Sequence, residues 1–436
     1  MARDQTSDEV VKTSEQDDEP IAAAPRAPSR RGGLQTFSSL QNNPDYRYLF
    51  AGNLFANAAQ WLQFITIGWL ALEISGSALH SIMAVAVRAL PTLLLGPWAG
   101  VMADRIDRRK LAMVTQVGIC AAALIFAVLV AREQVTTVWY LYAYTLVTGV
   151  FFAVKQPVRQ ALIANTVRRS DMANALALNA LAVTSMRLTG AGLGGVLIET
   201  LGFQWNFFVE AGLYIGMILL LIPMRTPYRE TSAAGNQSPM VNFKEGLTYI
   251  VKNRLMLRLM ALNFVRTAVF SPLLLLLPSY TVGALGEGAG IGTAMIVSMG
   301  IGGVTATFIM STWGFFIKKG LVSLIALLSG ATVITVLGLS HWVWLSVPIM
   351  LVMGLSQSHF IVANQTLVQS MVPDSLRGRV SSVWHYEQGL IPLFSLFIGL
   401  VAVWVGISWS LICFGAGALA LSLFFLARFK DIRALD

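Results

Sequence analysis

The chain has 436 residues, of which 56% are hydrophobic and 12% are charged, and its formal net charge is +9. An ordinary soluble protein carries about 25% charged residues, so this composition excludes that class. The positive charge does not indicate a nucleic-acid-binding protein. Most of the 31 Lys and Arg lie in the N-terminal tail and in alternate loops between apolar segments, rather than on one continuous face.

The N-terminal residues 1–43 are first acidic and then rich in Pro, Ala and Arg, without apolar periodicity, which predicts a disordered tail. Twelve segments of about 20 apolar residues follow, the length that crosses a hydrocarbon core about 30 Å thick. They lack the alternation of barrel strands, which favours helices. The predicted spans are residues 49–72, 79–102, 111–131, 137–153, 175–198, 203–224, 257–282, 291–313, 321–339, 343–363, 383–405 and 407–428.

These spans predict an all-α membrane protein with two pseudo-symmetric six-helix bundles, at residues 44–224 and 257–428. The cytoplasmic linker between them, residues 225–256, ends in a stretch of helical periodicity that predicts a helix on the membrane surface. Residues 429–436 form a second tail. Because Lys and Arg concentrate in alternate loops, the positive-inside rule places both termini in the cytoplasm of a multi-pass protein in the cytoplasmic (inner) cell membrane.

The two halves of the chain resemble each other weakly. Residues 159–163, after the fourth span, are similar to residues 364–368, after the tenth. Many transporters build alternating access to a site at mid-membrane from internal repeats of this kind. The repeat therefore favours a transporter.

A charged turn joins the second and third spans. It reads Gly100-Val101-Met102-Ala103-Asp104-Arg105-Ile106-Asp107-Arg108-Arg109-Lys110. Here the chain resembles the major facilitator superfamily, whose signature at this turn is Gly, then Asp-Arg, then a basic triplet. Four further stretches resemble its exporter branch, which includes the enterobactin exporter and macrolide efflux proteins: residues 72–78, 156–162, 173–179 and 372–380.

The resemblance implies that the charged turn holds the cytoplasmic side closed in one of two states. The expected gating motif consists of Gly100, Asp104, Arg105, Arg108, Arg109 and Lys110. The alternative is that the basic residues only set the topology. Acidic residues contribute little to orientation, so topology does not account for Asp104.

Three arginines lie near the middle of predicted spans: Arg88, Arg187 and Arg266. Each costs about 2.5–3.5 kcal/mol to insert, so such residues normally face a cavity or a partner. The deep acids are Glu210 and Glu387. In one interpretation the arginines line the substrate pathway and a glutamate carries a proton. In the other, glutamates or helix-end carbonyls neutralise the arginines.

Polar side chains in two other spans extend the predicted pathway. Asn53, Asn57 and Gln60 fall on one face of the first helix, and Gln357 lies in the tenth span. Aromatic residues near the outer end of the fourth span, including Trp139 and Tyr144, are expected to form an interfacial belt for the most part, and the alternative is that one or two of them stack on a substrate.

Together these patterns predict a secondary active transporter that exports a small molecule by alternating access. We expect a siderophore-like or drug-like cargo, and the surplus of cations favours an acidic one. No ATP-binding loop occurs in the sequence, so a gradient must drive export, and the family suggests proton antiport. The expected partners are the lipid bilayer, the substrate and protons, with no nucleic acid, and we expect a monomer.

No metal-ligand spacing or catalytic constellation occurs in the sequence, so we expect no metal, no cofactor and no enzymatic activity. Import and lysolipid flipping by the same fold remain alternatives, because direction does not follow from sequence. A membrane sensor and an intramembrane enzyme are less favoured alternatives.

Overall fold

The computed structural model describes residues 37–168, 171–226, 239–313, 318–373, 376, 379–380, 383–384 and 390–435. Within these ranges the chain is helical and contains no strand. The predicted all-α membrane fold is confirmed. A long helix stands at the place of eleven of the twelve predicted spans, and a shorter helix occupies the described part of the eleventh span.

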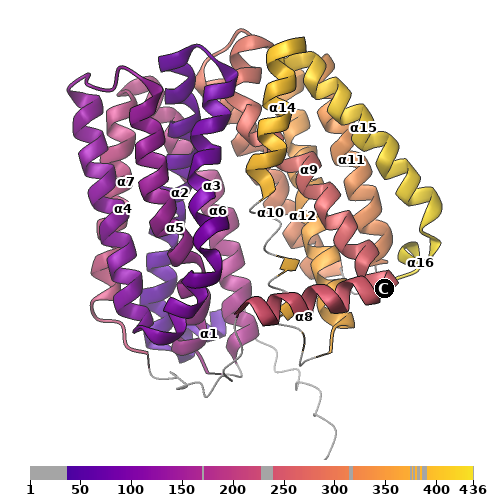
Figure 1. Ribbon diagram of the computed structural model, residues 1–436, viewed down its shortest axis with the longest axis horizontal. Coiled ribbons are helices and arrows are strands. Elements are labelled where there is room, and N and C mark those ends of the chain that lie inside the picture. The colour runs from indigo at the N-terminus through magenta and orange to yellow at the C-terminus, as the bar shows by residue number, and fades with distance from the viewer. Residues whose placement is uncertain are drawn as a thin grey trace, which may run out of the picture. The chain divides into compact units, whose positions relative to one another are not determined.

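The N-terminal bundle contains the first six long helices (Figure 1). They are α2 (Pro44–Ser75), α3 (Ala78–Arg105), α4 (Arg108–Ala131), α5 (Val138–Thr166), α6 (Met172–Thr200) and α7 (Phe203–Leu221). The turns between them use residues suited to sharp reversals. Gly76 ends α2 with a φ of 63°, which glycine adopts without strain. Asp107 caps α4 by accepting a hydrogen bond from the Lys110 backbone at 3.0 Å.

The C-terminal bundle contains the other six. They are α9 (Arg254–Gly283), α10 (Ala289–Trp313), α11 (Lys319–Leu339), α12 (Val343–Met371), α14 (Ile391–Val405) and α15 (Ile407–Arg428). In the described part of the chain, ten helices are long and apolar enough to cross a membrane. Helix α2 occupies the place of the first predicted span, and α14, with 15 residues, occupies the second part of the eleventh.

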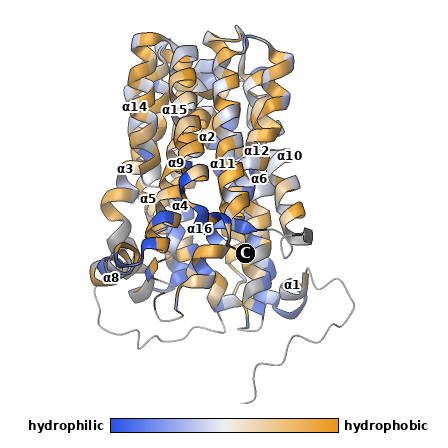
Figure 2. Cartoon of the chain, turned by 90° about the vertical axis from the view of Figure 1, so that its right-hand side faces the viewer, coloured by the Kyte–Doolittle hydropathy of each residue, from blue (hydrophilic) through white to orange (hydrophobic). Residues whose placement is uncertain are grey.

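Three short helices lie at one end of the molecule, which we call the linker side; the opposite end is the far side (Figure 1). They are α1 (Ser38–Asn42), α8 (Pro239–Lys252) and α16 (Lys430–Arg433). The surface helix expected in the linker is α8, which ends just before α9 begins. Hydrophilic residues gather toward the linker side, whereas the spans above are mostly hydrophobic (Figure 2).

Helix α1 lies inside the segment that the sequence assigns to the N-terminal tail. Ser39 is buried, and its hydroxyl and backbone N–H both donate to Asn174 Oδ1, at 2.7 and 3.1 Å. Residues 38–42 are therefore helical, although the prediction assigned them to a disordered tail that ends at residue 43. Composition alone does not reveal this boundary, because the contact that orders α1 comes from α6.

The bundles touch through the far-side halves of their helices. Helix α3 packs on α14, and α6 packs on α10. A β-carbon on Gly195 of α6 would lie 1.7 Å from Thr293 Oγ1 of α10, so only glycine allows this approach. Small residues bring helix backbones together in membranes in the same way.

Candidate functional site

A hydrogen bond joins the two bundles at mid-membrane. Arg187 Nη1 of α6 donates to Gln357 Oε1 of α12 at 3.0 Å. The sequence places both residues in the substrate pathway, and the structure brings them into contact. The Arg187 guanidinium also lies over the Trp61 ring, 5.7 Å from its centroid, so α2 contributes to the same joint. A β-carbon on Gly303 of α10 would lie 2.8 Å from Arg187 Nη2, so glycine there leaves room for the guanidinium.

Glu210 lies at the centre of a hydrogen-bonded group inside the N-terminal bundle. Its side chain is fully buried. Gln63 Nε2 donates to Glu210 Oε1 at 2.8 Å, and the Tyr144 hydroxyl lies 3.0 and 2.9 Å from the two carboxylate oxygens. Three helices, α2, α5 and α7, thus hold one carboxylate, as a buried charge requires.

The structure corrects the expectation for Tyr144. The sequence groups it with the interfacial aromatics of the fourth span, but its side chain is buried against Glu210 and stacks on Phe126 at 4.5 Å between ring centroids. Trp139, on the first turn of the same helix, is 72% exposed, as expected of a belt residue. Composition identifies the aromatic cluster, but only the helix packing shows which ring faces inward.

Arg88 is buried where α3 packs on α5. Its guanidinium lies over the Phe152 ring, 4.5 Å from the centroid. A β-carbon on Gly149 of α5 would lie 2.4 Å from the Arg88 carbonyl oxygen, so this glycine allows the two helices to approach. Among the described residues no ion pair joins Arg88 to Glu210. Both contact α5, Arg88 through Phe152 and Glu210 through Tyr144.

Lys155 of α5 was missed by the sequence reasoning. Its side chain is 3% exposed, and its ammonium has no hydrogen-bond partner within the described part of the chain. The nitrogen lies over the rings of Tyr214 and Phe152, 5.0 and 5.9 Å from their centroids. The predicted span ended at residue 153 because Lys155 and Arg159 resemble a membrane-surface flank, but α5 continues to Thr166.

The one signal that could have revealed Lys155 is the absence of a turn. Residues 154–166 carry no glycine, and Pro157 alone interrupts the helical pattern. A proline inside a helix removes one backbone hydrogen bond but does not have to end the helix.

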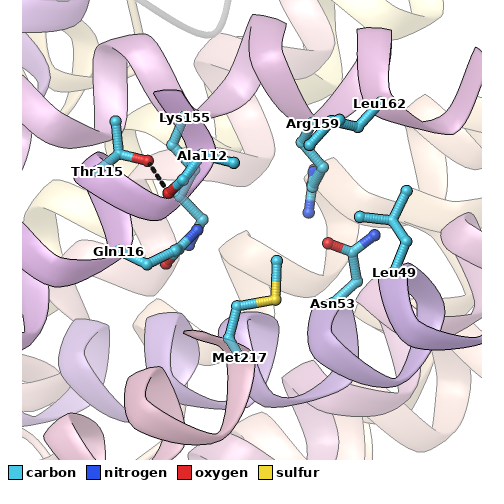
Figure 3. Close-up of a pocket in the computed structure, with 9 residues that line it drawn as sticks. All are labelled: Leu49, Asn53, Ala112, Thr115, Gln116, Lys155, Arg159, Leu162 and Met217. Atoms are coloured by element: carbon cyan, nitrogen blue, oxygen red, sulfur yellow. Dashed lines mark hydrogen bonds between the residues drawn. The ribbon is translucent and has the colours of Figure 1, made fainter. Parts of the chain in front are cut away.

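A small polar cavity lies between α2, α4, α5 and α7 (Figure 3). Lys155, Arg159, Gln116 and Asn53 supply its polar groups, and Met217 is among the apolar residues that close it. Its volume of about 10 Å³ gives room for about one water molecule. In Figure 3 the Arg159 guanidinium points toward Asn53, and Lys155 lies beside Gln116.

The predicted polar stripe of the first span is divided between two environments. Asn53 donates to Asn179 Oδ1 of α6 at 3.3 Å, and the Asn57 oxygen accepts from Arg159 Nη1 at 2.9 Å. Both asparagines are buried. Gln60 is only half-buried. The first two therefore hold α5 and α6 on α2, beside the cavity.

Arg266 lies apart from these groups, in the C-terminal bundle. It is buried and donates to Asn263 Oδ1 at 3.2 Å and to Thr267 Oγ1 at 2.7 Å, both on its own helix. Glu387, the second predicted proton carrier, lies outside the described residues.

The charged turn contacts helices of its own bundle. Arg108 Nη1 donates to Asn165 Oδ1 of α5 at 2.7 Å, and Arg109 donates to the carbonyl oxygens of Leu221 and Ile222 at the end of α7. A cation at a helix C-terminus is favourable because the carbonyl ends are partly negative. The exposed Lys110 follows on α4. The structure describes the backbone at Gly100, Asp104 and Arg105 but not the Asp104 and Arg105 side chains, so the gating motif stays a prediction.

Two bundles of helices, ten of them long and apolar enough to cross a membrane, fit a multi-pass membrane transporter. The family model described as transmembrane secretion effector matches residues 35–436. The chain therefore belongs to this family, within the major facilitator superfamily.

Two relatives and one solved structure illustrate the similarity. The staphyloferrin A transporter of Staphylococcus aureus is 24% identical over 381 residues, which cover 87% of this chain and 95% of the relative. The enterobactin exporter EntS of Citrobacter koseri is 23% identical over 368 residues, with 82% and 84% covered. The crystal structure of the nucleoside transporter NupG matches with a TM-score of 0.70 at 14% identity, with 88% of this chain and 100% of that chain covered, which shows the fold alone.

These findings define a multi-pass secondary transporter that exports small molecules. The family and the relatives do not favour import or lysolipid flipping. The relatives are transporters, so an enzymatic function is not favoured either.

Proposed function

We propose that the chain exports a small acidic molecule, of the size and kind of a siderophore, in exchange for protons. One observation carries this proposal: among the described residues of the N-terminal spans, bases inside the bundle outnumber acids. Arg88 and Lys155 are buried, and Arg159 and Arg187 are half-buried. Among the described residues the one buried carboxylate is Glu210. Such a surplus of positive charge inside a membrane protein favours an anionic cargo.

The position of Arg187 supports a role in the transport cycle. It connects α6 and α2 of one bundle to α12 of the other, so rocking of the bundles must break or distort its bond to Gln357. An acidic cargo would compete with Gln357 for the guanidinium, because an ion pair with a carboxylate is stronger than a bond to a neutral amide. Binding of cargo would then release the joint between the bundles.

Glu210 is the proposed proton carrier in the described part of the chain. It is surrounded by Gln63 of α2, Tyr144 of α5 and the positive charges of Arg88 and Lys155. A carboxylate in this position gains or loses a proton as the cations around it move or take up an anion. Binding of a proton to Glu210 and binding of an acidic cargo to the nearby cations would then be coupled.

The proposed orientation follows from the charge distribution. We place the linker side, which carries α8 and the basic turn, in the cytoplasm of a cell with the protein in its cytoplasmic membrane. The gating role of Asp104 and the proton-carrying role of Glu387 remain part of the proposal, as does a monomeric functional unit.

Flux in proteoliposomes tests the proposal. Purified protein is reconstituted, a pH gradient is imposed, and uptake of enterobactin and of the macrolide erythromycin is measured. We expect enterobactin to move against the direction of the protons, and to move faster than erythromycin. Protein-free liposomes serve as the control. Equal fluxes with and without the gradient would contradict the proton exchange, and preference for erythromycin would contradict the acidic cargo.

A further inference from the structure

Four buried polar atoms that line the cavity beside Lys155 have no hydrogen-bond partner among the described residues. They are two donors on basic side chains, Lys155 Nζ and Arg159 Nε, and two amide oxygens, Gln116 Oε1 and Asn53 Oδ1. Buried polar groups are nearly always hydrogen-bonded, so the cluster indicates that a water or an ion completes it, and the charge around the cavity distinguishes the two.

The charges around the cavity are one-sided. Lys155 and Arg159 are one turn apart on α5, on the same face of the helix, where like charges repel. Arg88 adds a third positive charge nearby, because its guanidinium and the Lys155 ammonium both lie over the Phe152 ring, 4.5 and 5.9 Å from the centroid. Glu210 is already bound by Gln63 and Tyr144, and it makes no ion pair with Lys155 within the described part of the chain. A buried ammonium in this field needs a further negative partner.

We propose that the cavity is a binding site for a small anion, held by Lys155 and Arg159. The volume suits one halide ion or one oxygen of a carboxylate, because it accepts an atom about the size of a water molecule. Lys155 Nζ and Arg159 Nε supply the free donors. The Gln116 amide can turn to present its NH₂ group, since the two ends of an amide have nearly the same shape. The Asn53 oxygen faces Arg159 and is the acceptor that the anion does not use (Figure 3).

The site connects to the rest of the bundle through α5. Pro157 lies between the two cations and removes one hydrogen bond of the helix at this level. Arg159 also donates to Asn57 of α2. An anion that attracts Arg159 therefore weakens this contact between α2 and α5. Occupancy of the cavity thus affects a helix contact that rocking of the bundle can use.

The anion has two possible sources. It is either a free monovalent ion such as chloride, or an acidic group of the cargo; the second source rests on the proposed export of an acidic molecule. Both sources use the same two donors. An experiment that offers each anion separately distinguishes them.

The thermal unfolding midpoint, Tm, of the purified full-length protein tests the site. In detergent, chloride is titrated against gluconate at constant ionic strength, because gluconate is far too large for the cavity. A ligand that binds only the folded state raises Tm in a concentration-dependent way. We expect chloride to raise the wild-type Tm in a saturating manner, and nitrate to do so less. If wild-type Tm is the same in chloride and gluconate and also does not respond to enterobactin, the proposal is overturned.

Two lysine variants locate the effect. Lys155→Met replaces the ammonium with an apolar group of similar length, and Lys252→Met makes the same change at an exposed residue of α8. We expect the chloride response to vanish in Lys155→Met and to persist in Lys252→Met. A chloride response of wild-type size in Lys155→Met contradicts the site. The wild-type titration decides the matter if that variant does not fold.

Enterobactin in place of chloride distinguishes the sources. A rise in wild-type Tm with enterobactin but not with chloride, lost in Lys155→Met, assigns the site to the cargo. A rise with chloride assigns it to a free ion. Flux in proteoliposomes is measured separately: normal flux with no anion response overturns this inference alone, whereas absent flux with a chloride response overturns only the proposed function.

Discussion

The two bundles share a helix order but differ in what they bury. The N-terminal bundle buries Arg88, Lys155 and Glu210, and its polar cavity has a volume of about 10 Å³. In the described part of the C-terminal bundle, Arg266 is the buried charged residue. There a cavity of about 530 Å³ between α9, α11, α14 and α15 is lined almost entirely by apolar residues. Among the described residues, buried charge is thus concentrated in the N-terminal bundle.

Neutralising Glu210 should have the largest effect on transport. Glu210→Gln keeps the shape and the contact with Tyr144 but removes the charge. We expect flux driven by a pH gradient to fall by at least about tenfold, equivalent to ~1.4 kcal/mol. Exchange of labelled for unlabelled enterobactin, which needs no net proton movement, should persist. The pH dependence of net flux should flatten as well. Full gradient-driven flux in this variant would show that the N-terminal charge group does not couple protons.

Breaking the joint between the bundles comes next. Arg187→Met removes the donor to Gln357, a hydrogen bond from a charged group that is worth about 1.5–3 kcal/mol. We expect a lower Tm and faster exchange between states. Gln357→Leu should produce much of the same effect, and the double variant should cost less than the sum of the two. Fully additive losses would mean that the two side chains do not act together.

Two glycines of the C-terminal bundle test how tightly its helices are packed. A β-carbon at Gly354 would lie 1.8 Å from the Met299 carbonyl oxygen, whereas one at Gly417 would meet no atom within 4 Å. We expect Gly354→Ala to destabilise the protein by about 1–3 kcal/mol through overpacking. Gly417→Ala should stabilise it by roughly 0.5–1 kcal/mol, since alanine suits a helix interior better. Thermal unfolding measures both. Similar shifts for the two variants would contradict the packing described for α10 and α12.

The smallest effect is expected at the linker side. Arg379 forms an ion pair with Glu245 of α8, and the two side chains are 31% and 39% exposed. Such surface pairs contribute about 0–1 kcal/mol. Glu245→Gln should therefore change Tm and flux only slightly, and less at high salt. A large loss of transport would show that α8 controls the cycle rather than only resting on the bundles.

Much of the fold can be predicted from the sequence, because hydropathy and charge directly encode membrane crossing. Eleven long helices, the shorter α14 and the linker helix α8 stand where the apolar and amphipathic periods place them. Within the site, the unusual cost of intramembrane charge and amide identifies Arg88, Arg187, Gln357 and Glu210 as special. That cost does not identify their partners. Nothing in the sequence marks Gln63 and Tyr144, and only the structure shows that both contact Glu210.

Lys155 shows why the rest could not be predicted. A hydropathy pattern ends a predicted span where charged residues begin, because charged residues usually lie at the membrane surface. Inside a bundle a cation can be buried among neighbouring helices, as Lys155 is between Phe152 and Tyr214. Burial of this kind depends on four helices at once, which no local pattern records.

The most direct test of the account is whether a gradient of acidic cargo moves protons by itself. Proteoliposomes with a trapped pH-sensitive dye are given an outward gradient of enterobactin and no pH gradient. We predict that the interior acidifies as enterobactin leaves through the wild-type protein, and that Glu210→Gln and protein-free liposomes show no such change. Efflux of enterobactin at constant interior pH, or equal acidification with Glu210→Gln, would contradict it.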